Sequence, residues 1–234
     1  MRFATLFSCL LLIGTMLTMA TAAEPAANGA DEQEPPIDLL AEGLDGWDFH
    51  VVDPDVERDA VWSLEDGILK TTGEPFGYLS TKESFDHLHL TLEWRWAPGT
   101  EPGNSGVLLR IDGEPVTFLV RCVECQLMHG RAGDIWAFYG FELSGDEERF
   151  REIKEHEALG DFIGVGHIKD AEKEPGEWNC YDITLQGGKL TVVVNGELVN
   201  EAHEVEVLCG PIGLQSEGGE IHFRNLHVRR LEAD

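Results

Sequence analysis

The chain has 234 residues, of which 44 are Asp or Glu and 17 are Lys or Arg, so its formal net charge at pH 7 is −27. A negative field of this size repels phosphate backbones and anionic lipid surfaces. The composition therefore argues against a nucleic acid or a membrane as a partner, and the length suits one domain.

The N-terminal residues have the layout of a signal peptide. An apolar stretch over residues 6–20 is followed by small residues up to Ala23, ahead of Glu24. The apolar stretch is too short to span a bilayer, so cleavage after Ala23 would leave a secreted or periplasmic protein. Residues 24–36 are polar and Pro-rich and predict a flexible acidic tail. The folded domain is expected over residues 37–231.

The rest of the chain predicts strands and turns, with almost no helical periodicity. Strands are expected over residues 61–64, 68–72, 78–81, 88–96, 107–111, 116–127, 181–185, 190–194 and 221–228. This pattern predicts an all-β fold, most simply a sandwich of two sheets.

Three dipeptides between strand-like segments suit the positive φ angles of tight two-residue hairpins. They are Asp66-Gly67, Asp112-Gly113 and Asn195-Gly196. Such hairpins predict antiparallel sheets. The densely charged segment 144–157 interrupts the pattern and predicts either a short helix or a surface loop that borders the ligand face or an edge.

Strand 88–96 separates two kinds of side chain. Leucine and tryptophan occupy the even positions, whereas His89, Glu93 and Arg95 share the opposite face. The apolar face is expected in the core. Glu93 and Arg95 then either pair at the surface or contact ligand hydroxyls together.

Strand 116–127 brings Glu124 and Gln126 onto the face of Cys122. Burial beside apolar groups would raise the pKa of Glu124, which suits a proton carrier. Alternatively, the strand only reaches solvent there. Cys122 and Cys125 are predicted to be buried thiols, because strand residues three apart point to opposite faces about 10 Å apart. Cys180 and Cys209 could form a disulfide.

Several short motifs follow one another along the chain. They are Trp47, Trp62 with Asp66-Gly67, Glu93-Trp94-Arg95, Asn104-Ser105-Gly106, Glu124-Cys125-Gln126, Trp178-Asn179, Asn195-Gly196, Gly210-Pro211-Ile212-Gly213-Leu214-Gln215 and Phe223-Arg224-Asn225. In this order they resemble the 3-keto-disaccharide hydrolase domain family over about residues 37–231.

The resemblance implies a concanavalin A-like jelly-roll sandwich with a ligand groove on its concave sheet, exported by a bacterium. It also implies a hydrolase or lyase that cleaves sugars already oxidised at carbon 3. The substrate-binding residues that we expect on this basis are Glu93, Arg95, Asn104, Gln126, Trp178, Gln215 and Arg224.

The sequence departs from the family pattern at two positions. His129 stands where the family often has an Asp, and Glu217 stands where it often has a His, so that an acid and an imidazole are exchanged. We therefore hypothesise a hydrogen bond between their side chains. With Glu124, they are the candidate catalytic residues for removal of the carbon-2 proton and elimination of the group on carbon 1, with or without hydration. The same three side chains could hold a divalent metal, although no metal site is clearly encoded.

Two other classes of function remain open. A non-catalytic carbohydrate-binding module would bind sugar in the same groove without turnover. A scaffold for assembly would use the sandwich only as a surface.

Overall fold

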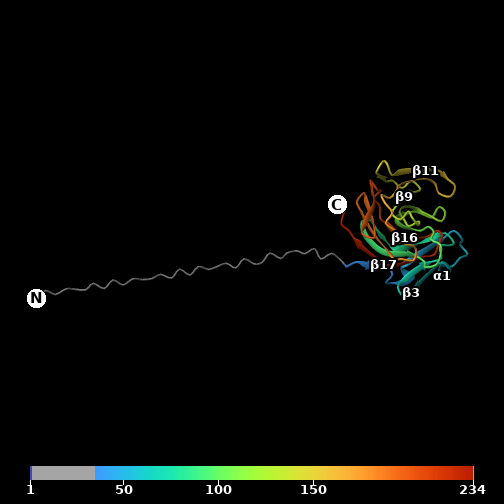
Figure 1. Cartoon of the computed structure of the whole chain (residues 1–234), viewed down its shortest axis with the longest axis horizontal. Helices are drawn as coiled ribbons and strands as arrows, with labels where there is room; N and C mark the ends of the chain where they lie inside the picture. Colours follow the sequence, from blue (N-terminus) through green and yellow to red (C-terminus); the bar gives the residue numbers. More distant parts are fainter. Residues whose placement is uncertain (2–34, 234) are drawn as a thin grey trace. The chain divides into compact units, whose positions relative to one another are not determined.

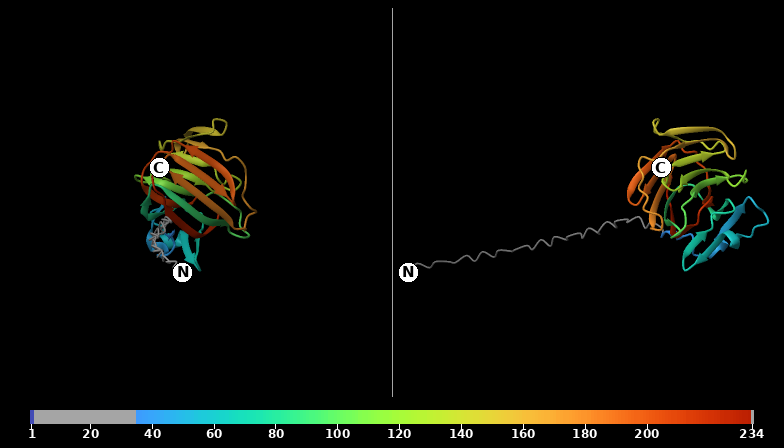
Figure 2. Two further views of the ribbon diagram at one scale, coloured as in Figure 1. Left: turned by 90° about the vertical axis from the view of Figure 1, so that its left-hand side faces the viewer. Right: turned by 45° about the vertical axis from the view of Figure 1, so that its right-hand side comes forward.

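The computed structural model describes Met1 and residues 35–233. Within this part of the chain, two antiparallel sheets pack face to face (Figure 1, Figure 2). The nine-stranded sheet has the order β10 (Ser144–Gly145), β15 (Glu197–His203), β14 (Lys189–Val194), β13 (Asn179–Gln186), β6 (Leu88–Trp96), β17 (Ile221–Arg230), β4 (Ile68–Thr71) and β3 (Trp62–Glu65), with β1 (Ile37–Asp38) also on β17.

The eight-stranded sheet carries the candidate site. Its order is β11 (Phe150–His156), β12 (Gly160–Val165), β9 (Ile135–Phe138), β8 (Arg121–Gln126), β7 (Gly106–Asp112), β16 (Gly210–Ser216), β5 (Gly77–Phe85) and β2 (Trp47–Val51). The described helices are the short α1 (Arg58–Val61) and the 3-10 helix η1 (Gly43–Gly46). The prediction of an all-β, two-sheet sandwich is confirmed.

The main core lies between the sheets, as the alternation in β6 predicts. Leu88, Leu90, Leu92, Trp94 and Trp96 are at most 1% exposed. They belong to one apolar cluster that also contains inward-facing residues of β7 and β8. Burial of this continuous surface is the main stabilising contribution to the fold.

Two of the three predicted hairpins form. Asp66 and Gly67 have φ angles of 51° and 74°, and Asn195 and Gly196 have φ angles of 52° and 81°. These values suit two-residue turns between twisted strands. The prediction at Asp112-Gly113 is wrong in detail, because β8 begins only at Arg121. The intervening residues 113–120 form a longer loop.

Loop 113–120 folds over the outer face of the eight-stranded sheet. Its Phe118, Leu119 and Val120 pack in a second apolar cluster with Cys122 and Phe138. Apolar residues on this face are therefore covered by the chain itself, which leaves a pocket at one side of the loop.

The prediction of a helix or loop over residues 144–157 is wrong. This segment contains β10 and β11, and β11 pairs with β12 as a hairpin at the edge of the eight-stranded sheet (Figure 1). Its residues are half-buried or exposed. The high charge of β11 fits an edge strand, where charge discourages pairing with another chain.

Cys122 and Cys125 are buried free thiols on opposite faces of β8, as predicted. Cys180 and Cys209 are exposed and free, so the possible disulfide does not form. Apart from Met1, the predicted signal peptide (1–23) lies outside the described residues, and so does the predicted tail (24–36) up to residue 34. Among the described residues, no helix combines the length and the hydropathy that crossing a bilayer requires.

Candidate active site

A pocket of about 630 Å³ opens on the outer face of the eight-stranded sheet. Strands β8, β9, β11, β12 and β16 contribute side chains, and the others come from the β11–β12 turn and from the loops that flank β5, β7, β8 and β16. One part of its lining is polar and the other is aromatic. The polar lining residues are Asn104, Glu124, Gln126, Arg131, Asp134, His156, Gln215 and Glu217.

Glu124 is an acid buried in the wall of this pocket. It lies on β8 between Leu108 of β7 and Trp136 of β9, and it is 1% exposed. Burial raises the pKa of its carboxyl well above the ordinary value, and the negative charges of Glu217 and Asp134 raise it further. The surroundings of Glu124 therefore favour its protonated form. Its Oε1 atom has no hydrogen-bond partner among the described residues.

The absence of a side chain at Gly106 makes room for this carboxyl. A Cβ atom on Gly106 would lie 1.9 Å from Glu124 Oε1 and 2.8 Å from Gln215 Oε1. Both oxygens therefore lie over the bare backbone of β7. Gln215 is 1% exposed, and its Oε1 atom also lacks a partner among the described residues.

Glu217 is the second acid, and it follows the end of β16. Burial raises its pKa to about 7, although hydrogen bonds with the side chains of Asn104 and Gln215 lower it. Because a carboxylate accepts hydrogen bonds, the two amide groups donate to it. Asn104 Oδ1 is left, like Gln215 Oε1, without a partner among the described residues.

Close backbone contacts fix the loops that carry Asn104 and Glu217. The backbone nitrogen of Asn104 donates to the carbonyl of Gly218 at 2.7 Å. A Cβ atom on Gly103 would lie 1.8 Å from that same carbonyl oxygen. Only glycine at position 103 permits this approach.

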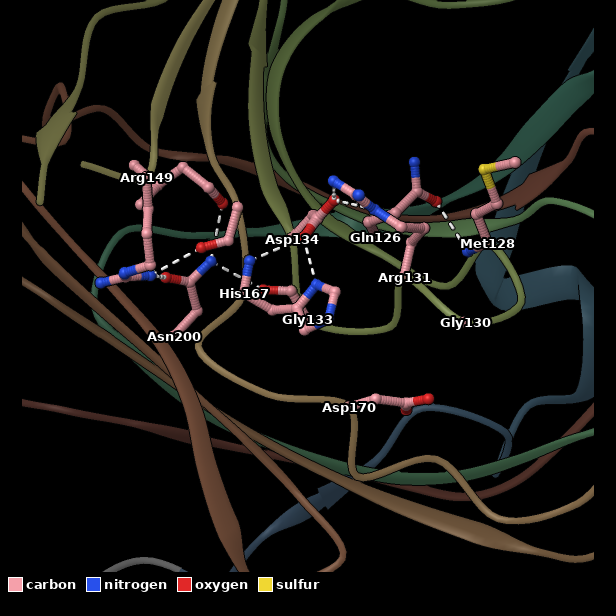
Figure 3. Close-up of polar contacts among 12 residues, drawn as sticks. Gln126, Met128, Gly130, Arg131, Gly133, Asp134, Arg149, His167, Asp170 and Asn200 are labelled. Atoms are coloured by element: carbon pink, nitrogen blue, oxygen red, sulfur yellow. Dashed lines mark hydrogen bonds and ion pairs between the residues drawn. The ribbon is translucent and has the colours of Figure 1, made fainter. Parts of the chain in front are cut away.

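Asp134 links the pocket to its surroundings (Figure 3). Arg131 Nε donates to Asp134 Oδ2 at 2.7 Å. On the other side, Asp134 Oδ1 accepts from the backbone nitrogen of His167 at 2.7 Å and lies 2.5 Å from His167 Nδ1. Asp134 is 1% exposed, whereas the side chain of Arg131 is 49% exposed. Among the described residues, Arg131 is the Lys or Arg side chain that lines the pocket.

Gln126 is oriented by the backbone beside it. Its Oε1 atom accepts from the backbone nitrogens of Leu127 and Met128, each at 2.9 Å (Figure 3). The side-chain oxygen is thus occupied, and the amide nitrogen remains available to a ligand in the pocket.

Aromatic side chains form the other part of the lining. Trp136 and Phe138 lie on β9 and Phe162 on β12. The ring centroids of Trp136 and Phe162 are 5.4 Å apart, and those of Phe138 and Phe162 are 5.1 Å apart. Phe76 and Phe118 form another pair at 5.4 Å.

The structure brings five of the expected site residues together in this pocket: Asn104, Glu124, Gln126, Gln215 and Glu217. Four others lie on the outer face of the nine-stranded sheet. There Arg224 Nε pairs with Glu93 Oε2 at 2.5 Å, and the guanidinium groups of Arg95 and Arg224 lie 4.5 and 4.0 Å from the Trp178 ring centroid. The core separates this cluster from the pocket, so these four residues do not line it.

His129 also lies apart from Glu217. Its Nδ1 atom is 3.0 Å from Oε1 of Glu172, which is 2% exposed at the side chain. Glu172 also accepts from Trp96 Nε1 at 3.1 Å and from the backbone nitrogen of Gly130 at 2.8 Å. His129 therefore joins two loops through Glu172, and the hypothesised hydrogen bond to Glu217 does not form.

Sequence reasoning missed Arg131, Asp134, Trp136 and Phe162. Gly130 and Gly133, both with positive φ, bracket the turn that presents Arg131 and Asp134. The alternation of Trp136 and Phe138 along residues 135–138 marks a strand face, but four residues give a weak pattern.

Oxygen donors dominate the polar lining. Glu124, Glu217 and Gln215 would suit a hard cation such as Ca²⁺ or Mg²⁺ better than a soft one. Within the described residues, however, no cluster of three or more His, Cys, Asp or Glu could hold a metal ion. The metal site hypothesised from His129, Glu124 and Glu217 is therefore not assembled.

Comparisons with known proteins agree with the fold and add a family. A family model described as "3-keto-alpha-glucoside-1,2-lyase-like domain" matches residues 36–229. A "putative glycosyl hydrolase" from Parabacteroides distasonis is similar in structure, with 21% identity, a TM-score of 0.60, and coverage of 85% of this chain and 100% of that one. No curated protein sequence matches.

A carbohydrate-binding module, CBM66 from Bacillus subtilis, is also similar. It has 12% identity and a TM-score of 0.57, and the match covers 79% of this chain and 95% of that one. At these identities the likeness establishes the jelly-roll sandwich and nothing about the ligand.

Proposed function

Because the chain belongs to the 3-keto-alpha-glucoside-1,2-lyase-like domain family, we propose that it cleaves glycosides already oxidised to a ketone at carbon 3. The observation that carries this proposal is the pair of acids with raised pKa values in one pocket, the buried Glu124 and the half-buried Glu217. Such a pair can supply one acid and one base at neutral pH.

The two acids take different roles because their surroundings differ. Glu217 accepts hydrogen bonds from two amides, which favour its carboxylate form, and its pKa is about 7. Glu124 lacks such donors, and its burial favours the protonated form. Glu217 is therefore the base and Glu124 the acid, since a catalytic pKa near the working pH gives efficient proton transfer.

The first step is an elimination. The ketone acidifies the proton on carbon 2, and Glu217 removes it. The bond between carbon 1 and the glycosidic oxygen breaks, and the proton of Glu124 moves to the departing oxygen. A double bond forms between carbons 1 and 2, and the group on carbon 1 leaves as an alcohol.

Arg131 stabilises the charge that develops on the ketone oxygen during this step. It is the cation of the described pocket, and its guanidinium is held by Asp134. The unpartnered oxygens of Asn104 and Gln215 and the free amide of Gln126 can meet sugar hydroxyls, which both donate and accept hydrogen bonds.

A second step would convert the elimination into a net hydrolysis. Glu124, now a carboxylate, takes a proton from water as the water oxygen adds to carbon 1. Glu217 returns its proton to carbon 2. Both acids regain their starting forms, and the product is the 3-keto sugar with a hydroxyl on carbon 1.

The test is release of nitrophenol from a 3-keto-glucoside, with the unoxidised glucoside as control. We expect release from the keto sugar alone and a loss of about 100-fold or more in Glu217→Gln, whereas Glu124→Gln should lose as much only with an alkyl 3-keto-glucoside, whose alcohol needs a proton to leave. Glu93→Gln is the matched carboxylate variant on the opposite side of the core, and it should retain turnover. Loss of turnover with a chelator would add a metal to the mechanism.

A carbohydrate-binding module is the second candidate function, and the fold shared with a binding module from Bacillus subtilis favours it. It predicts that keto and ordinary sugars bind in this pocket without release of nitrophenol. Calorimetric binding with no turnover of any keto sugar would establish this alternative and contradict the enzyme.

Export is a separate proposal that rests on the sequence of residues 1–23. Expression of the whole chain in a bacterium should give a mature protein that begins near Glu24. A protein that retains Met1 and stays in the cytoplasm would contradict it.

A further inference from the structure

The aromatic part of the pocket points to the chemistry of the group that leaves. We propose that the aglycone on carbon 1 is apolar, an aryl or alkyl group and not a second sugar. This inference rests on the proposed function, because it assigns the acidic part of the same pocket to the 3-keto sugar.

The polarity of the pocket changes along neighbouring strands. Trp136 is the direct cross-strand neighbour of Glu124, and Phe138 is the neighbour of Cys122 two pairs further along β8 and β9. Phe162 follows across the next pair of strands, opposite Phe138. A ligand held at the carboxyl of Glu124 would thus meet aromatic rings when it extends toward β12.

This aromatic surface is built into the sheet. A Cβ atom on Gly164 would lie 2.3 Å from Cε3 of Trp136, so the indole rests directly on the bare backbone of β12. Phe162 meets the same indole edge to face, at an interplanar angle of 75°. Rings held in this way bind without losing much conformational freedom.

The rest of this lining is apolar as well. Phe118 and Leu119 come from loop 113–120, and Phe118 packs edge to face on Phe76 at an interplanar angle of 72°. Ile153 and Leu159, from β11 and the β11–β12 turn, extend the apolar surface. The pocket therefore offers apolar contacts on more than one side of the leaving group.

Few polar groups line the aromatic part of the pocket. His156 lies next to Phe162, at 5.7 Å between ring centroids, and its Nδ1 atom already accepts from the backbone nitrogens of Ala158 and Leu159. A second sugar would bring several hydroxyls to these rings and would lose water without equivalent partners. An aryl or alkyl group incurs no such cost.

The test compares two 3-keto-glucosides whose leaving alcohols are similarly basic, so that binding and not leaving-group chemistry decides. One carries a 2-phenylethyl group, and the other is the corresponding 3-keto-disaccharide. We expect kcat/KM to be about tenfold or more higher for the phenylethyl compound, since each buried aromatic contact contributes about a factor of several. Both anomers are measured.

Variants locate the preference. Trp136→Ala and Phe162→Ala should reduce the ratio of the two kcat/KM values about tenfold, mainly through a higher KM for the phenylethyl compound. Trp178→Ala removes a tryptophan from the opposite side of the core and should leave the ratio unchanged. Thermal unfolding of each variant shows that it is folded.

The outcomes separate the two proposals. Equal kcat/KM values, or a preference for the disaccharide, would overturn the apolar aglycone and leave the enzyme intact. If neither compound is cleaved, the enzyme proposal fails. Binding measured by calorimetry then tests whether the pocket prefers an apolar group on carbon 1. Tighter binding of the phenylethyl compound than of methyl 3-keto-glucoside, lost in Trp136→Ala, would support it, and equal binding would overturn it.

Discussion

Gly106 lies directly beneath the carboxyl group of Glu124, so that a Cβ atom at this position would stand 1.9 Å from Glu124 Oε1. The same atom would also crowd Gln215 Oε1 at 2.8 Å. Both oxygens face the pocket without partners among the described residues. A single missing side chain thus creates the space in which the two groups meet a ligand.

Gly106→Ala should therefore disrupt the site. The added methyl group must displace the Glu124 carboxyl in a packed sheet, which typically costs about 1–3 kcal/mol of stability. We expect turnover of the 3-keto-glucoside to be lost and the unfolding temperature to fall. Gly188→Ala is the control, because its Cβ would find its nearest neighbour at 3.6 Å. A Gly106→Ala enzyme with normal kcat would contradict this account.

Glu217 should make the folded protein less stable as the pH rises. Its pKa is raised from 4.5 to about 7, so between these values the folded state holds a proton that the unfolded state has released. The stability linked to this proton is complete below about pH 4.5 and is lost as the pH rises through about 7, by up to about 3 kcal/mol. Glu124 acts in the same direction.

Denaturant unfolding at pH 5 and pH 8 measures this effect. The loss of stability between the two pH values should be smaller in Glu217→Gln than in the wild type. Glu65→Gln is the matched control, because an ion pair with Lys70 lowers the pKa of Glu65. An unchanged difference in Glu217→Gln would show that Glu217 titrates normally.

Arg131→Lys should reduce kcat about tenfold or more, with little change in KM. Lysine keeps the positive charge but loses the planar fork that Asp134 orients. The effect then falls on the transition state, where charge develops on the ketone oxygen. Steady-state kinetics test this, with Arg121→Lys, whose ion pairs with Asp112 and Glu206 lie outside the pocket, as control. Equal kcat values would remove Arg131 from the mechanism.

Glu172→Ala should lower stability by about 1–3 kcal/mol, because it leaves the buried Trp96 Nε1 without its hydrogen-bond acceptor. His129→Ala should cost less, since the side chain of His129 is 42% exposed. Thermal unfolding measures both losses. We expect His129→Ala to retain kcat, and a large loss of kcat would return His129 to the catalytic machinery.

Period-two alternation predicts which side chains share a strand face, and the family resemblance selects the candidate site residues among them. The alternation placed Glu124 and Gln126 on one face of β8 and sent the leucines and tryptophans of β6 into the core. Glu93 and Arg95 show the same alternation, yet they face solvent on the other sheet. The alternation along a strand predicts which residues share a face. It does not predict which of these faces becomes the pocket, because that depends on strand pairing and on the loops that pack over each sheet.

The remainder of the site depends on contacts that are distant in the sequence. Arg131 and Asp134 enter the pocket through a turn between β8 and β9, and Asp134 meets His167 only because β12 pairs with β9. The charged strand β11 reads as a helix or loop, because an edge strand does not need an apolar face. Exchange of an acid and an imidazole suggested a His129–Glu217 pair, but the nearby Glu172 takes the imidazole instead.

The hairpin of β11 and β12 lies at the free edge of its sheet, yet its Ile153, His156 and Phe162 reach the pocket. The acids stand on β8 and after β16, further inside the same sheet. Under the proposed function, the hairpin therefore carries one part of the surface that meets the leaving group, at a distance in the chain from the two acids. A change or a laboratory graft of this hairpin could alter the fit of the leaving group while the two acids stay unchanged.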